Sequence, residues 1–184
     1  MAVLEITTPD ALDPLARAIR AAADRTVRAL GDLLASEPDS LQVLRLMKFK
    51  EIGHHPIDER RLNVIEQVNQ TFTYLVTLEA ARWLMARHPG LALKINLGTA
   101  SGFDLESVAP GDVAAEVFAA TRPVNNDKLR KDVTRLAEKA TQFKHRYVFF
   151  SCPGCTLGRQ TQWETVAGIE VWSLPPDTLL KGAP

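Results

Sequence analysis

The spacing of apolar residues changes along the chain, and this change constrains the fold more than any other feature. A long segment with helical spacing is followed by three short segments of period two, which Gly and Pro separate. A second helical segment and two further strands follow. The predicted helices are 59–87 and 126–141, and the predicted strands are 91–97, 103–108, 113–121, 146–151 and 169–174. This order indicates an α/β fold with a mixed central sheet flanked by helices.

The first part of the chain is expected to form a helical arm. Residues 11–35 space Leu, Ile and Ala at helical intervals with arginines between them, which predicts an amphipathic helix. Residues 41–49 form a short helix or strand. We therefore expect an arm at 1–55 and a core at 56–184, within one compact domain. The arm helix is also a plausible homodimer surface.

A short connection joins arm and core. His54 and His55 precede Pro56 in a segment with turn character, and adjacent histidines rarely bind one metal, so we expect a solvent-exposed turn. Asp58 is a good N-cap for the long helix.

Composition narrows the class of protein. Apolar residues make up 46% of the chain and charged residues 24%, as in ordinary globular proteins. No apolar run approaches the ~18 residues that span a bilayer, and the N-terminus does not resemble an export signal. We expect a cytoplasmic protein without a membrane segment. Because the net charge is zero, a surface that is basic throughout and binds nucleic acid is disfavoured, although a local basic groove is not.

Two carboxylates in the period-two region are unusual. Asp104 lies on the second predicted strand, and Glu116 lies on the third, among almost wholly apolar neighbours. A buried carboxylate is costly unless a cation or metal compensates it. Two such groups on consecutive hairpin strands can converge on a divalent ion such as Mg²⁺. The structural alternative is that Glu116 pairs with a nearby Arg or Lys.

The same region resembles a known family. The element order, the Gly-x-Asp that ends at Asp104, the Ala-Glu-Val-x-Ala around Glu116 and the continuation 123–132 resemble the PD-(D/E)XK nuclease superfamily. The resemblance covers residues 59–174 and implies a restriction-endonuclease-like three-layer core. It also implies that Asp104 and Glu116 bind Mg²⁺ or Mn²⁺.

The chain departs from the family pattern at the lysine position, which holds Phe118. Residues i and i+2 share a strand face, so Phe118 points to the same side as Glu116 but cannot move a proton. In some members the following helix supplies the missing group, which here implies Lys128 or Lys131. With Arg135 these lysines form a basic stripe that is either a nucleic-acid contact or a solvated helix face.

A third carboxylate in this superfamily often comes from the first core helix. Glu66 is the candidate for a metal or water contact, and Glu79 is its rival. Both also fit ordinary surface positions.

Two functional hypotheses follow from these residues and the resemblance. The first is a metal-dependent nuclease of restriction or repair type that hydrolyses phosphodiester bonds of DNA. The second is a catalytically inactive nuclease-like module that binds nucleic acid or a protein partner.

The two cysteines form a single CxxC motif, Cys152-Pro-Gly-Cys155. This motif supplies two zinc ligands where a structural site needs four. Three alternatives remain: a structural or incidental pair, zinc shared across an interface, and a redox role.

Overall fold

The structure is a computed structural model that describes residues 3–58, 60–98 and 100–175. The chain divides into two compact units. The first comprises Met1–Leu12 and Leu75–Pro184, and the second comprises Asp13–Tyr74. The second unit contains most of the predicted arm and extends into the long helix that follows it.

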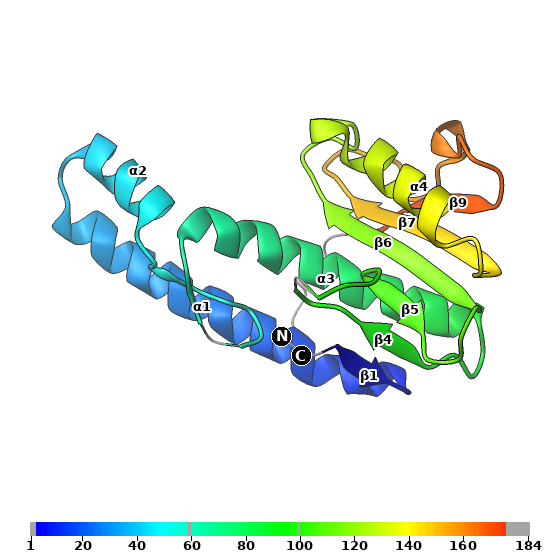
Figure 1. Ribbon diagram of the computed structural model, residues 1–184. Coiled ribbons are helices and arrows are strands. Elements are labelled where there is room, and N and C mark those ends of the chain that lie inside the picture. Colours follow the sequence, from blue (N-terminus) through cyan, green and yellow to red (C-terminus); the bar gives the residue numbers. More distant parts are fainter. Residues whose placement is uncertain (1–2, 59, 99, 176–184) are drawn as a thin grey trace. The chain divides into compact units, whose positions relative to one another are not determined.

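A seven-stranded mixed sheet forms the centre of the first unit (Figure 1). Its strands, in spatial order, are β1 (Leu4–Ile6), β4 (Leu93–Ile95), β5 (Leu105–Ser107), β6 (Val113–Ala119), β7 (His145–Ser151), β9 (Ile169–Ser173) and β8 (Gly158–Arg159). The strands from β1 to β6 pair antiparallel, whereas β6, β7 and β9 run parallel. The prediction that the three period-two segments form one mixed sheet is therefore confirmed. The short strands β1 and β8 were not predicted, because two or three residues carry too little pattern.

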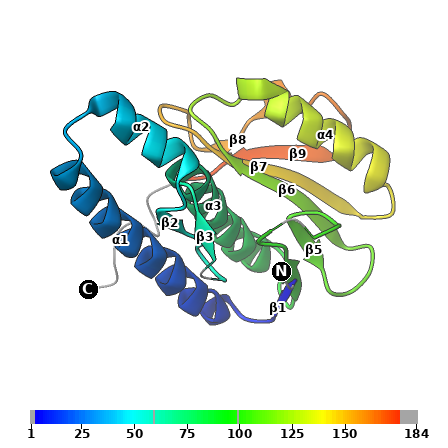
Figure 2. The ribbon, with the colours of Figure 1, turned by 60° about the vertical axis from the view of Figure 1, so that its left-hand side comes forward.

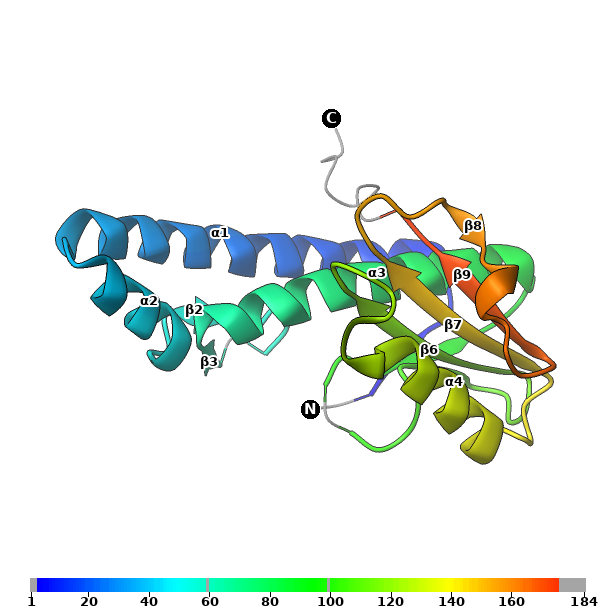
Figure 3. The ribbon, with the colours of Figure 1, turned by 90° about the horizontal axis from the view of Figure 1, so that it is seen from above.

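Helices cover both faces of this sheet, as Figure 3 shows. On one face, α4 (Lys128–Lys139) buries Leu129, Val133 and Leu136 in a cluster with residues of β6, β7 and β9. On the other face lies the C-terminal half of α3 (Val64–Arg87), whose Trp83 ring packs 5.3 Å from that of Phe149. Successive side chains of a strand alternate between the two faces. Glu116 therefore lies on the α4 face, with its neighbour Phe118.

The second unit is mainly helical. Figure 2 shows α1 (Asp13–Ser36) and α2 (Ser40–Phe49) running in opposite directions. Residues 41–49 are thus helical, and the Asp39 carboxylate caps them by accepting from the Leu41 backbone N–H at 2.8 Å. Two residues on the predicted apolar face of α1, Val27 and Leu34, are exposed. The predicted homodimer through this helix stays a prediction.

The remaining elements are short. They are the hairpin of β2 (Gly53–His54) with β3 (Arg61–Leu62) and three 3-10 turns at Pro9–Leu12, Asn125–Asp127 and Thr161–Trp163. No helix in the described ranges combines the length and the apolar character needed to cross a bilayer.

The start of α3 corrects the expected N-cap. The helix begins at Val64 rather than at residue 59, and the Asn63 side chain accepts from the Glu66 backbone N–H at 2.9 Å. Asp58 instead accepts from the Arg60 side chain within the β2–β3 loop. A hairpin that separates Asp58 from the helix explains the difference.

The first turns of α3 also present a different face from the predicted one. Ile65, Val68 and Phe72 are exposed, while Gln67 and Thr71 are buried and hydrogen bonded to each other at 3.3 Å. Helical spacing predicts that these apolar residues face the core. Gln67 and Thr71 lie there instead, although Gln67 Oε1 is buried without a hydrogen-bond partner in the described chain.

His55 is fully buried, so the prediction of a solvent-exposed turn at this residue is wrong. Its Nδ1 accepts from the backbone N–H groups of Ile57 and Asp58, both at 3.2 Å. Nε2 lies 3.1 Å from the Tyr74 hydroxyl. The Asp58 carboxylate also lies close to Nδ1, with its Oδ1 at 2.9 Å. The ring organises the loop from within rather than facing solvent.

The free energy of unfolding is expected to fall in acid because of His55. Burial, the largest cause, lowers the pKa of His55 in the folded chain, with Asp58 acting in the opposite direction. Below its ordinary pKa of 6.5 the unfolded chain binds a proton more readily than the folded chain, so stability is lost as pH falls through this range. One such group changes the slope by at most about 1.4 kcal/mol per pH unit.

Urea titrations between pH 5 and pH 8 test this expectation. His55→Asn keeps an acceptor near the Nδ1 position but cannot titrate, so its stability should depend less on pH than that of the wild type. Equal slopes for wild type and His55→Asn would contradict the assignment.

Candidate functional site

Asp104 comes directly before β5, and Glu116 lies on β6, the neighbouring strand in the sheet. The β5–β6 register pairs Leu105 with Ala115 and Glu106 with Ala114. Continued by one residue beyond the start of β5, this register sets Asp104 opposite Glu116. The backbone N–H of Val117 donates to Asp104 Oδ2 at 2.8 Å, which fixes the carboxylate against β6. The structure therefore brings together the two acids that the sequence singled out.

Glu116 is almost wholly inaccessible, with 1% of its surface exposed. Burial is the main cause that raises its pKa to about 9, and the Asp104 carboxyl group adds to the rise through its charge and a hydrogen bond. Arg135 acts in the opposite direction, since its Nη1 donates to Glu116 Oε1 at 2.5 Å. Burial and the carboxyl groups outweigh this single cation, so the pKa of Glu116 is raised.

Arg135 is held in place by more than this carboxylate. Its second guanidinium nitrogen donates to the backbone carbonyl of Gly102, and its guanidinium carbon lies 5.1 Å from the centroid of the Phe103 ring. The structural alternative, an ion pair between Glu116 and a nearby Arg, is thus present in the fold.

Asp132 is a third carboxyl group in the same place, and sequence reasoning missed it. Its side chain on α4 is only 4% exposed, and Lys128 Nζ donates to its Oδ1 at 2.6 Å. Burial raises the pKa of Asp132 to about 6, against the opposing effect of Lys128. The Asp104 charge raises it further, and the Asp132 charge in turn raises the pKa of Glu116. The missed signal was its spacing from the buried Leu129 and Leu136, which places an acid on the inward face of α4.

The basic stripe divides between the site and the surface. Lys128 and Arg135 reach the buried carboxyl groups, as described above. Lys131 instead donates to the Asn126 backbone carbonyl at 3.0 Å, on the exposed start of α4. All three side chains therefore make hydrogen bonds within the chain, so none of them interacts with solvent alone.

The other predicted residues have different surroundings within their own units. Glu66 is exposed in the first turn of α3, in the second unit, whereas Asp104 and Glu116 belong to the first. Glu79 pairs with Arg82 at 3.0 Å. Phe118 is buried on the α4 face and its ring stacks on that of Phe150 at 5.6 Å, so the lysine position of the family pattern is part of the core.

Three carboxyl groups and two cations thus meet between β5, β6 and α4. Within the described ranges, no three His, Cys, Asp or Glu side chains are gathered as the ligands of one metal ion would be. The donor set nevertheless suits a hard divalent cation, because carboxylate oxygens outnumber the cations and Asp132 Oδ2 is buried without a hydrogen-bond partner in the described chain.

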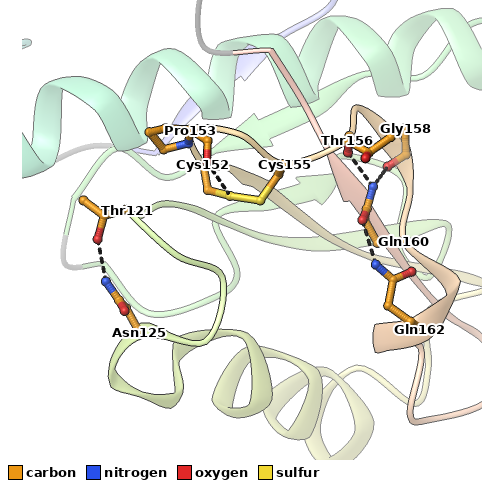
Figure 4. Close-up of a disulfide and its surroundings, with 9 residues drawn as sticks. All are labelled: Thr121, Asn125, Cys152, Pro153, Cys155, Thr156, Gly158, Gln160 and Gln162. Carbon is orange, nitrogen blue, oxygen red and sulfur yellow. Dashed lines mark hydrogen bonds between the residues drawn. A yellow bond between two sulfur atoms is a disulfide. The ribbon is translucent and has the colours of Figure 1, made fainter.

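Cys152 and Cys155 form a disulfide directly after β7 (Figure 4). Cys152 is buried in the same cluster as Phe118 and Leu129, under α4. In this oxidised form neither sulfur is a thiolate, so the zinc alternative applies only to the reduced chain. The structural and redox alternatives both agree with the bond.

Comparison of the chain with protein-family models, curated proteins and solved structures finds no match.

Proposed function

We propose that the chain is a metal-dependent nuclease with a restriction-endonuclease-like core, which hydrolyses phosphodiester bonds of DNA. The observation that carries the proposal is that Asp104, directly before β5, lies next to the buried Glu116 of β6 and near the cations of α4. The order of α3, the antiparallel strands β4 to β6, α4 and the parallel strand β7 also agrees with the order on which the family resemblance rests.

Asp104 and Glu116 would hold Mg²⁺ or Mn²⁺. When bound, such an ion polarises a phosphodiester and lowers the pKa of an attacking water. The protein's own groups supply the rest of the chemistry. Arg135 carries a fixed positive charge next to Glu116, where it can stabilise charge that develops on a phosphate. Phe118 and Phe150 close the core behind the site and keep water away from that side.

Lys128 is the amine that we assign to the missing lysine position. Its Nζ is fixed by Asp132, a group close enough to Asp104 for their charges to interact. Lys131 caps a surface turn instead. The structure thus favours the first of the two lysines that the sequence left open.

Lys128→Ala is expected to lower the turnover number by about 10²-fold, the usual contribution of a positioned acid or base. Lys131→Ala is the matched control, because it removes the same charge from the same helix three residues away. Its turnover number should stay close to that of the wild type. Single-turnover cleavage at saturating metal measures both, and a larger loss in the Lys131 variant would reverse the assignment.

The proposal itself is tested with purified protein and labelled single- and double-stranded DNA. Cleavage with Mg²⁺ or Mn²⁺, and none after chelation by EDTA, is the expected result. The second candidate, an inactive binding module, is favoured by the Glu116–Arg135 ion pair and by Phe118. DNA binding that needs no metal, without cleavage under any of these conditions, would replace the nuclease by this module.

A further inference from the structure

The Oδ2 oxygen of Asp132 has no hydrogen-bond partner among the described residues, although it is buried. A buried carboxylate oxygen without a partner is unfavourable, so such atoms are uncommon in folded proteins. The other oxygen, Oδ1, is already bound by Lys128 Nζ at 2.6 Å. Oδ2 is therefore the Asp132 oxygen that is available to a further ligand.

The position of Asp132 on α4 directs it toward the two strand carboxylates. Lys128, Asp132 and Arg135 follow one another at i, i+4 and i+7 and share a helix face. Arg135, at one end of this row, contacts Glu116 on β6, and Lys128 at the other end contacts Asp132. Asp132 thus lies between the two cations on the face that packs against the sheet.

We propose that Asp132 is a third metal-binding carboxylate, which contributes Oδ2 to the divalent cation while Oδ1 holds Lys128. The inference rests on the proposed function and adds a ligand to the same site. Glu66, the ligand expected from the sequence, lies exposed in the other unit. A hard cation accepts several oxygen ligands, and three carboxylates from β5, β6 and α4 form such a set.

Arg135 would compete with a bound cation for the Glu116 carboxylate. Its guanidinium occupies Glu116 Oε1, the oxygen that a cation would use. A divalent ion that replaces it brings two charges to the carboxylates in place of one, and releases Arg135 toward a bound phosphate. In this proposal Arg135 neutralises Glu116 in the metal-free protein and contacts the phosphate when the metal is bound.

Calorimetric titration with Mn²⁺, in the absence of DNA, tests the role of Asp132. Asp132→Asn removes the ligand charge at constant size and should weaken Mn²⁺ binding by about tenfold or more, because even groups that only support a ligand contribute 10–100-fold. Asp127→Asn is the matched control, since Asp127 is an exposed acid next to the start of the same helix and pairs with Arg130. Its affinity should equal that of the wild type.

Lys128→Met separates a ligand from a residue that merely positions the lysine. If Asp132 binds the ion, removal of the lysine leaves Mn²⁺ affinity unchanged or makes it tighter. A loss as large as that of Asp132→Asn would overturn the inference, and this test holds even if Asp132→Asn does not fold, which circular dichroism will show.

The two proposals fail in different ways. Wild-type affinity in Asp132→Asn, with binding lost in Asp104→Asn, would overturn the ligand role of Asp132 and leave the nuclease proposal standing. Absence of Mn²⁺ binding by the wild type would overturn both.

Discussion

Replacement of Glu116 by Gln is expected to abolish metal-dependent cleavage of DNA. The change keeps the size of a side chain that is fully enclosed, and it removes the charge that would hold the cation. A metal ion stabilises the transition state by several kcal/mol, and about 4 kcal/mol corresponds to a ~10³-fold lower rate. Asp104→Asn should have an effect of the same size, because the backbone N–H of Val117 holds the Asp104 carboxylate next to Glu116.

Cleavage rates with saturating Mg²⁺, measured for the two variants and for Glu138→Gln, provide the comparison. Glu138 is an exposed acid on α4, the same helix as Lys128, and its replacement should leave the rate unchanged. Folding of each variant is followed by circular dichroism. If Glu116→Gln cleaves DNA at the wild-type rate, Glu116 has a structural role alone and the binding-module alternative gains support.

The sheet and the acid pair could be predicted from the sequence, because both follow from apolar spacing at every second residue. The apolar segment around Glu116 predicted a strand, and side chains alternate between the two faces of a strand. The same rule correctly placed Phe118 beside Glu116 on the buried face. Local periodicity was therefore sufficient for the parts of the site that lie on β5 and β6.

Asp132 and Arg135 were harder because their roles depend on how α4 packs. The spacing of Asp132 from Leu129 and Leu136 placed it beside the apolar stripe of α4, but the sequence did not show which strands and charged groups that stripe meets. Arg135 bonds Glu116 across 19 residues, and Asp132 becomes notable only when its burial is known. His55 was misplaced for a similar reason, since its partner Tyr74 lies on another element.

Glu116→Gln is also expected to stabilise the metal-free protein, by about 3 kcal/mol at pH 7. In the folded chain the pKa of Glu116 is raised from 4.5 to about 9, mainly by burial and by Asp104. Between these two values the folded chain keeps a proton that the unfolded chain has released, so the free energy of unfolding falls as pH rises. Each pH unit above 4.5 costs about 1.4 kcal/mol relative to a side chain that does not titrate, up to the raised pKa.

Urea denaturation in EDTA at pH 5, 6, 7 and 8 measures this difference. The gain in Glu116→Gln should be small at pH 5 and grow with pH, whereas Glu138→Gln should stay within about 0.5 kcal/mol of the wild type, as surface changes do. If Glu116→Gln is less stable at every pH, Glu116 is charged and its pair with Arg135 gives net stability. A buried carboxylate beside another carboxylate lowers the stability of the fold. If Glu116→Gln removes activity and raises stability, Glu116 is present for function rather than for folding.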